Sequence, residues 1–269
     1  MDLVTIPYQF LGSLCHRIYD PKLFHGVKHY VLFIGYPRSG HTLVGFLLDA
    51  HPQIVVASQT SALRYIKYGF RTQQIFHLLA QNSRRVAKTG REQRRYSYNV
   101  PNQWQGRYEN LQAIGESTGL TRLRRNPSLL GSLRARLNGV DLKLIHVIRN
   151  PYDNISTMSL RRGESLPDAI QRYFSMCEFV EGLKPQVEPG AVHDLKHEDL
   201  ISDPQSTLKE LCGFFGPSAG DKYYQDCASI IFKSSHKTRH DVEWSAELIA
   251  SVKQQMSGFP FLSAYAYDD

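Results

Sequence analysis

Cysteine is scarce in this chain of 269 residues, which contains four of them. Cys15, Cys177, Cys212 and Cys227 show no CxxC or other metal-ligand spacing. This spread argues against both a structural zinc site and the disulfide framework of a small secreted domain. It is typical of buried thiols in a reducing compartment, so we predict a cytoplasmic protein.

Long apolar runs are also missing. The segment 1–25 carries Asp2, Arg17, Asp20 and Lys22, and it has no continuous apolar stretch that could cross a bilayer or serve as a signal peptide. We therefore expect no membrane span. A leader or anchor removed from the sequence would leave the same pattern.

The net charge and the chain length exclude few classes of protein. The net charge of +7 fits an anionic ligand or an acidic partner, but it also fits many ordinary soluble proteins. With 42% hydrophobic residues, the chain can bury a substantial core. We expect a single domain over 1–269.

A lysine is absent where a phosphate-binding loop would carry one. An apolar strand over 31–35 leads into a loop that ends at Gly40, and a helical pattern follows directly. Thr42 stands where a Walker A loop has its hydroxyl, but His41 takes the lysine position. Arg38 supplies a cation three residues earlier.

The physics of such a loop does not depend on the nucleotide. N–H groups at a helix N-terminus are unpaired and attract an anion. Gly40 lets the backbone approach that anion closely, and Arg38 adds a planar, permanently charged fork for phosphate oxygens. The alternative is a tight strand-to-helix connection without a ligand.

Strand and helix patterns alternate along the remaining chain. Further strands are predicted at 53–57, 110–115, 143–149 and 191–195, and helices at 61–82, 127–137, 166–181, 204–215, 220–232 and 245–256, with another helix opened by Asn150-Pro151. This alternation predicts an α/β fold in which a P-loop-like central parallel sheet is covered by helices on both faces.

A basic run interrupts the alternation. Arginine and lysine residues are concentrated over 84–98, and Pro101 and Trp104 follow. We interpret 84–106 as an insertion or lid between core elements. The run is either a solvated face or a surface that holds an anionic acceptor.

A second anion site is predicted at Arg149. This residue ends the strand 143–149, and Thr157 lies two turns into the helix that Pro151 starts. Ligands of parallel sheets bind at the carboxyl ends of strands, so Arg149 and Thr157 are placed to hold a second phosphate group. Pairing of Arg149 with an acid such as Asp153 is the alternative.

Together these two elements resemble the sulfotransferases that use 3′-phosphoadenosine 5′-phosphosulfate (PAPS). In that family a Pro-Lys/Arg-Ser-Gly-Thr-Thr loop holds the 5′-phosphosulfate. A strand ending in Arg-Asn/Asp-Pro, with a hydroxyl residue eight positions after the Arg, holds the 3′-phosphate. Residues 36–42, Tyr-Pro-Arg-Ser-Gly-His-Thr, are similar to the first motif, and Arg149-Asn-Pro with Thr157 is similar to the second.

Three further stretches extend the resemblance over roughly 30–244. Leu48-Asp-Ala-His-Pro52 looks closest to the tyrosylprotein sulfotransferase branch. Residues 194–200 and the helix behind them are similar to the family's Tyr-Glu-Asp-Leu region. Residues 233–239, with Trp244, look like the C-terminal loop that closes over the 3′-phosphate and adenine.

The resemblance implies a set of cofactor-binding residues. These are Pro37, Arg38, Ser39, Gly40, His41 and Thr42 at the 5′ end, Arg149 and Thr157 at the 3′-phosphate, and Ser235, Lys237 and Arg239 in the C-terminal loop. A lysine-rich exposed loop without a ligand is the alternative for the last three.

Sulfuryl transfer needs cations at the bridging oxygen and a base for the acceptor proton, but it requires no metal. Arg38 is the candidate cation. His41 replaces the family's usual threonine, and it either touches the leaving phosphate or sulfonate or packs at the helix start. We therefore expect Arg38, His41 and Glu116 as the catalytic residues.

The catalytic base is missing from the position that the tyrosylprotein branch uses. Gln59 stands where the tyrosylprotein branch has a glutamate, and an amide cannot accept the proton. Glu116, at the end of the strand 110–115, is the best substitute by position. A structural Glu116 that caps a neighbouring segment is the alternative.

We expect a PAPS-dependent sulfotransferase that acts on a hydroxyl, or an amine, of a small molecule, carbohydrate or peptide and releases 3′-phosphoadenosine 5′-phosphate (PAP). Gln59 suggests a PAP- or PAPS-binding protein without transfer activity as an alternative. A nucleotide kinase is a second alternative, but it would need the missing lysine. Nucleic-acid binding rests on the basic run alone and is not expected.

Overall fold

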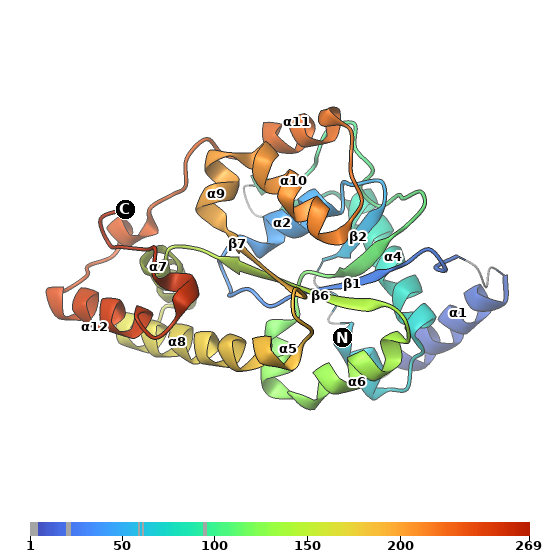
Figure 1. The fold of residues 1–269 in the computed structure, drawn as a ribbon, viewed down its shortest axis with the longest axis horizontal. Helices are drawn as coiled ribbons and strands as arrows, with labels where there is room; N and C mark the ends of the chain where they lie inside the picture. The colour runs from blue at the N-terminus through green and yellow to red at the C-terminus, as the bar shows by residue number, and fades with distance from the viewer. Residues whose placement is uncertain (1–4, 20–22, 59, 61, 94–95) are drawn as a thin grey trace.

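The computed structural model describes residues 5–19, 23–58, 60, 62–93 and 96–269. At its centre lies a five-stranded sheet in the order β2-β5-β1-β6-β7 (Figure 1). The strands are β1 (His29–Phe33), β2 (Ile54–Ala57), β5 (Ala113–Glu116), β6 (Asp141–Ile148) and β7 (Val192–Lys196). Every neighbouring pair is parallel. The predicted α/β fold with a central parallel sheet is confirmed.

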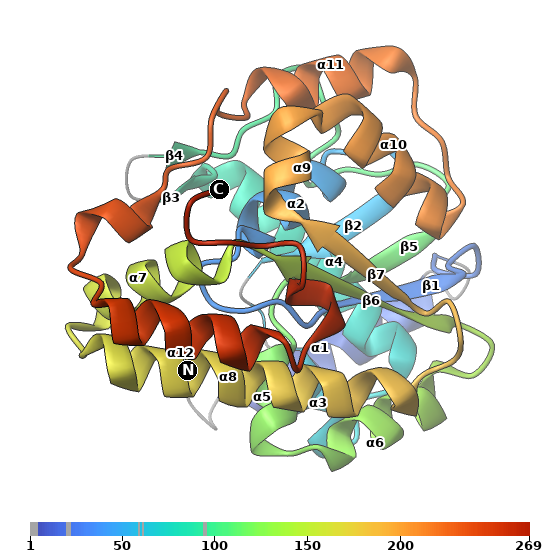
Figure 2. The same ribbon diagram turned by 60° about the vertical axis from the view of Figure 1, so that its left-hand side comes forward.

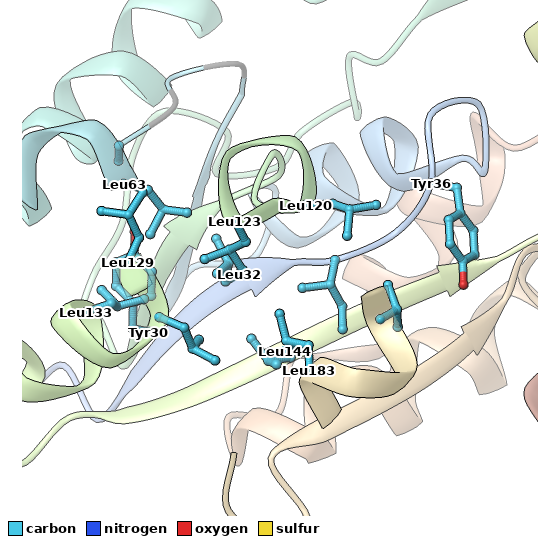
Figure 3. Packing of buried hydrophobic residues seen from close by; sticks show 14 of the residues in the cluster. Tyr30, Leu32, Tyr36, Leu63, Leu120, Leu123, Leu129, Leu133, Leu144 and Leu183 are labelled. Carbon is cyan, nitrogen blue, oxygen red and sulfur yellow. The ribbon is translucent and has the colours of Figure 1, made fainter. Parts of the chain in front are cut away.

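Helices cover both faces because successive strand residues point to opposite sides. Val31 and Phe33 of β1 pack on one face with α2 (His41–Leu48), α10 (Pro204–Phe215) and α11 (Asp221–Ser229). Tyr30 and Leu32 pack on the other (Figure 3). The helices of that second face are α3 (Leu63–Lys67), α4 (Thr72–Thr89), α5 (Leu120–Arg125), α6 (Ser128–Leu137), α7 (Pro151–Arg162), α8 (Leu166–Leu183) and α12 (Ala246–Met256).

One helix prediction was wrong. The region 61–82 is not one helix, because α3 ends at Lys67 and α4 begins at Thr72. Gly69 breaks the pattern with a φ of 79°, a conformation that glycine adopts readily. Residue 61, where that predicted helix began, lies outside the described residues. Three helices were not predicted: α1 (Thr5–Tyr19), α5 and α9 (His197–Ser202).

The basic run divides into different environments. Arg84, Arg85 and Lys88 are exposed on the last turns of α4. Arg91, by contrast, is 3% exposed, and its Nη2 lies 2.6 Å from Asp49 Oδ2 at the end of α2. Arg94 and Arg95 lie outside the described residues.

The predicted insertion is fastened at several points. After Arg91 it forms a short hairpin of β3 (Glu92–Gln93) and β4 (Tyr96–Ser97). The Tyr96 hydroxyl donates to the carbonyl of Ile230, and Gln103 donates to Asp226 on α11 over 2.7 Å. The segment therefore packs against α2 and α11.

Cys177, Cys212 and Cys227 are buried free thiols, as their spacing suggested. Burial raises the pKa of Cys177 to about 12, so this thiol stays protonated at neutral pH. None of the helices in the described part of the chain combines the length and the apolar character that crossing a membrane requires.

Candidate functional site

The loop after β1 makes a tight turn at the carboxyl end of the sheet. The backbone N–H of Ser39 donates to the carbonyl of Tyr36 over 3.2 Å, with Pro37 and Arg38 between them. Arg38 has a φ of 73°. Proline followed by a residue of positive φ is the arrangement of a type II turn, and an arginine there is strained. The turn holds Tyr36 in the core and exposes the Arg38 side chain.

Gly40 joins this turn to the start of α2. It has a φ of 96°, and no side chain caps the helix there, so the first N–H groups of α2 are open to a ligand. A Cβ on Gly40 would lie 2.5 Å from His197 Nδ1. His197 was not predicted, although it directly follows β7 at the same edge of the sheet. Burial and the nearby Arg149 lower the pKa of His197 to about 4.

His41, the first residue of α2, is held by the loop. Its Nδ1 lies 3.0 Å from the carbonyl oxygen of Tyr36. A carbonyl only accepts, so Nδ1 carries the proton and Nε2 of the neutral ring is an acceptor. Burial lowers the pKa of His41, and the charge of Arg38 adds to this effect. The imidazole is therefore neutral near pH 7.

Arg149 connects the loop to a second group of polar residues. Its Nη1 lies 3.4 Å from the carbonyl oxygen of Arg38 and 3.3 Å from Thr157 Oγ1. Its Nη2 lies 2.6 Å from the carbonyl oxygen of His236 and 3.2 Å from Thr238 Oγ1. The two threonine hydroxyls are 3.1 Å apart. The structure thus brings together Arg149 and Thr157, as predicted, and adds Thr238.

The segment around Thr238 passes α7 before it enters α12 (Figure 2). Ser235 is half-buried and Lys237 is exposed. Arg239 is buried and forms a two-pronged pair with Asp153, with Nε to Oδ1 at 3.0 Å and Nη2 to Oδ2 at 2.7 Å. Its Nη1 donates to the carbonyls of two residues near the end of the chain, Ala266 and Tyr267. Asp153 therefore pairs with Arg239, and not with Arg149.

Helix α7 also supports the first loop. The side-chain amide of Asn154 donates to the carbonyl of Pro37 over 3.0 Å. Ser39 Oγ is buried without a hydrogen-bond partner among the described residues, and Thr42 is half-buried in the first turn of α2. The loop thus offers hydroxyl and backbone donors on a framework fixed by two helices.

Residues 31–219 match the sulfotransferase family. The chain belongs to this family. The match starts in β1 and ends after α10, so it includes both the loop and Arg149. A search of curated protein sequences found no match to the chain.

Solved sulfotransferase structures share the fold. The sulfotransferase domain of the curacin biosynthetic pathway has a TM-score of 0.53 and 16% identity, over 86% of this chain and 96% of that domain. The sulfotransferase domain of the Synechococcus PCC 7002 olefin synthase has a TM-score of 0.52 and 15% identity, over 84% of this chain and 92% of that domain. Sulfotransferase STF1 from Mycobacterium tuberculosis has a TM-score of 0.50 and 15% identity, over 92% of this chain and 81% of that one.

Within this sulfotransferase fold, Glu116 lies at the end of β5 and is fully buried. Its carboxylate accepts from the backbone N–H groups of Ala62 at 2.7 Å and Leu63 at 3.1 Å, and from the Thr60 hydroxyl at 3.3 Å. These bonds tie the start of α3 to β5. Burial raises the pKa of Glu116 to about 7, against the opposing effect of the three donors. The value would suit a base, but the oxygens are already engaged.

We expect Glu116 to make the sulfotransferase less stable as pH rises. Its pKa is 4.5 without the fold and about 7 within it, so the unfolded chain loses this proton first and unfolding becomes easier between those values. A change of this size is worth about 3 kcal/mol. Urea unfolding at pH 5 and pH 8 should show a smaller pH effect in Glu116→Gln than in the native chain. The same pH dependence of unfolding in the native chain and in Glu116→Gln would contradict the raised pKa of Glu116.

No group of three or more His, Cys, Asp or Glu side chains within the described ranges is arranged to hold a metal ion. Gln59, which was compared with the glutamate of the tyrosylprotein branch, lies outside the described residues. The resemblance to the tyrosylprotein branch stays a prediction.

Proposed function

We propose that this member of the sulfotransferase family moves a sulfuryl group from PAPS to a hydroxyl or amine acceptor and releases PAP. The observation that carries this proposal is the position of Arg149. One guanidinium contacts the backbone of the 5′ loop at Arg38 and the hydroxyls of Thr157 and Thr238. Two anion-binding positions next to each other suit a nucleotide with phosphate groups at both the 5′ and 3′ carbons.

In this proposal the 5′-phosphosulfate lies at the start of α2. Backbone N–H groups and the hydroxyls of Ser39 and Thr42 donate to it, and Arg38 supplies the positive charge. Pro37 and Gly40 shape the turn. The 3′-phosphate lies at Arg149, Thr157 and Thr238, with Ser235 and Lys237 on the adjoining segment.

We propose a role for Arg239 that differs from the one that the resemblance implies. Its guanidinium is engaged by Asp153 and by two backbone carbonyls. We propose that Arg239 anchors the segment that carries Thr238, and that it does not touch the phosphate itself. The chain is proposed to form one domain over 1–269, with 84–106 as an insertion fastened to α2 and α11.

The reaction has simple requirements. The acceptor oxygen forms a bond to sulfur, the bond between sulfur and the phosphate oxygen breaks, and the phosphate leaves with an added negative charge. Arg38 and the N–H groups of α2 stabilise that charge. A kinase would need a lysine at position 41 and a carboxylate for Mg²⁺ near the end of β6, where this chain has His41 and Arg149.

The engaged oxygens of Glu116 favour one competing function, a protein that binds PAP or PAPS without transfer. Calorimetry with PAP and with ATP tests the nucleotide site that both functions share. We expect PAP to bind at least tenfold more tightly than ATP. Equal or tighter ATP binding would overturn the PAPS assignment. Release of PAP from PAPS, followed across phenolic, sterol, carbohydrate and amine acceptors, then separates transfer from binding alone.

A further inference from the structure

A chain of hydrogen bonds runs from the exposed Asp194 to the buried Tyr36 beneath the 5′ loop. Asp194 on β7 and His146 on β6 are direct neighbours in the parallel register, and Asp194 Oδ1 lies 2.9 Å from His146 Nδ1. His146 Nε2 lies 2.9 Å from the hydroxyl of Tyr36. Figure 3 shows the Tyr36 side chain pointing from the loop toward the sheet. His146 and Tyr36 are both fully buried.

The ionised state of Asp194 determines which atom donates and which accepts in each hydrogen bond. Burial would raise the pKa of Asp194, but the hydrogen bonds from His146 and Lys184 outweigh it and lower that pKa to about 2. The carboxylate can therefore only accept, so His146 carries its proton on Nδ1 and accepts on Nε2. The Tyr36 hydroxyl then donates to His146. Lys184 completes the outer end of the chain, with Nζ 2.8 Å from Asp194 Oδ2.

Tyr36 connects this chain of hydrogen bonds to the proposed phosphosulfate site. Its ring is wedged between His146 and Tyr173, with ring centres 5.2 Å and 4.9 Å away. Its carbonyl oxygen receives the Nδ1 proton of His41 and the N–H of Ser39. A shift of the Tyr36 ring would therefore move the group that orients His41.

We propose that His41 Nε2 is the proton acceptor for the attacking hydroxyl and that the chain Asp194–His146–Tyr36 positions it. This inference rests on the proposed sulfuryl transfer. Among the described candidates, Glu116 has its carboxylate engaged at the start of α3. His41 lies in the loop at the proposed phosphosulfate, and its Nε2 is left as the accepting atom.

With His41 as the base, every proton and electron pair of the transfer is accounted for. The O–H bond of the acceptor breaks as its oxygen bonds to sulfur, and the proton passes to His41 Nε2. PAP departs with the electron pair of the broken sulfur–oxygen bond. The resulting imidazolium returns the proton to water after PAP is released.

The surroundings keep His41 in the basic form. Burial lowers the pKa of His41, and the charge of Arg38 in the same loop lowers it further, while the hydrogen bond to the Tyr36 carbonyl opposes this shift. From α9, His197 packs against Gly40 beside it. Activity is therefore expected to fall only at pH values below the ordinary pKa of histidine.

Paired substitutions at position 41 test the catalytic role. Asparagine retains a donor for the Tyr36 carbonyl but has no basic nitrogen, so His41→Asn should bind PAP normally and lose turnover by about 10²- to 10⁴-fold. His41→Ala should lose both the donor and the base. The control His193→Asn, on the other face of β7, should leave turnover unchanged. Turnover of His41→Asn within about threefold of the native chain overturns the proposal.

Tyr36→Phe and Asp194→Asn test the positioning role. Both should lower kcat by roughly tenfold with little change in KM for PAPS, and both should shift the acid limb of the pH profile. Nitrogen NMR of the imidazoles gives a readout without turnover. The native chain should show His41 protonated at Nδ1, and Tyr36→Phe should mix the two tautomers. A native His41 protonated at Nε2 would falsify the inference.

The same measurements separate this inference from the proposed function. If PAP binds and no acceptor receives sulfate, the transfer function fails. The NMR result still reports whether the hydrogen bonds of Asp194, His146 and Tyr36 orient His41. If transfer occurs and His41→Asn retains it, the transfer function stands and the base lies elsewhere. Thermal unfolding of each variant identifies any that fail to fold.

Discussion

Replacing Arg149 with alanine is expected to weaken PAP binding by about 10²- to 10⁴-fold. Each charge-assisted hydrogen bond to phosphate is worth about 1.5–3 kcal/mol, and about 1.4 kcal/mol is a factor of ten in affinity. The substitution also leaves the carbonyl of His236 and the hydroxyl of Thr238 without the guanidinium that orders them. The proposed 3′-phosphate site therefore loses the charge of Arg149, and the segment carrying Thr238 loses the hydrogen bonds that order it.

The variant Arg149→Lys separates the effect of the positive charge from that of the guanidinium geometry. A lysine keeps the charge but cannot reach both Arg38 and His236 with one planar fork, so we expect it to restore only a small part of the affinity. Arg161→Ala, an exposed arginine at the end of α7, is the matched control and should bind PAP as the native chain does. Calorimetry gives the affinities. PAP binding by Arg149→Ala within threefold of native would count against a 3′-phosphate at this position.

Gly115→Ala is expected to destabilise the fold strongly. Gly115 lies in β5 between Val56 of β2 and Val31 of β1. An added Cβ would collide with the backbone carbonyl of Val31, and a backbone group in a central strand cannot move aside. We expect a loss of about 4 kcal/mol or more, which lowers the melting temperature by roughly 10 °C in a chain of this size.

The control for this prediction is Gly131→Ala. Gly131 lies inside α6, and nothing stands within 4 Å of an added Cβ. Alanine is the better helix former by about 1 kcal/mol, so this variant should melt at the same or a slightly higher temperature. Thermal unfolding by circular dichroism measures both. A Gly115→Ala variant that melts like the native chain would mean that β5 has room the structure does not show.

The sheet could be predicted because buried parallel strands leave continuous apolar runs, as in Val31–Ile34. Loop geometry was harder. The break between α3 and α4 depends on one glycine, Gly69, inside an otherwise helical pattern. The helices α5 and α9 have six residues each, which is too short for a clear period.

The position of Arg38 and Arg149 at the carboxyl end of the sheet was predictable, because each follows an apolar strand pattern. The site was not predictable where segments far apart in the sequence meet. Nothing in the sequence says that Asp153 takes Arg239, or that Asp194 reaches Tyr36 through His146. The pairing of His146 with Asp194 depends on strand register, and the pairing of Asp153 with Arg239 depends on how the segment at Arg239 packs against α7. Sequence patterns determine neither. Thr238 was not predicted, because a single hydroxyl between Lys237 and Arg239 forms no recognisable motif.

The reach of Arg149 across two loops has a thermodynamic consequence. Its guanidinium touches the backbone of Arg38 on one side and of His236 on the other. In the proposed site, a ligand group that orders one loop lowers the entropic cost of ordering the other, and this coupling is reciprocal. A single bisphosphate nucleotide then gains more than the sum of its two ends, while nucleotides with phosphate at one end alone receive no such cooperative benefit.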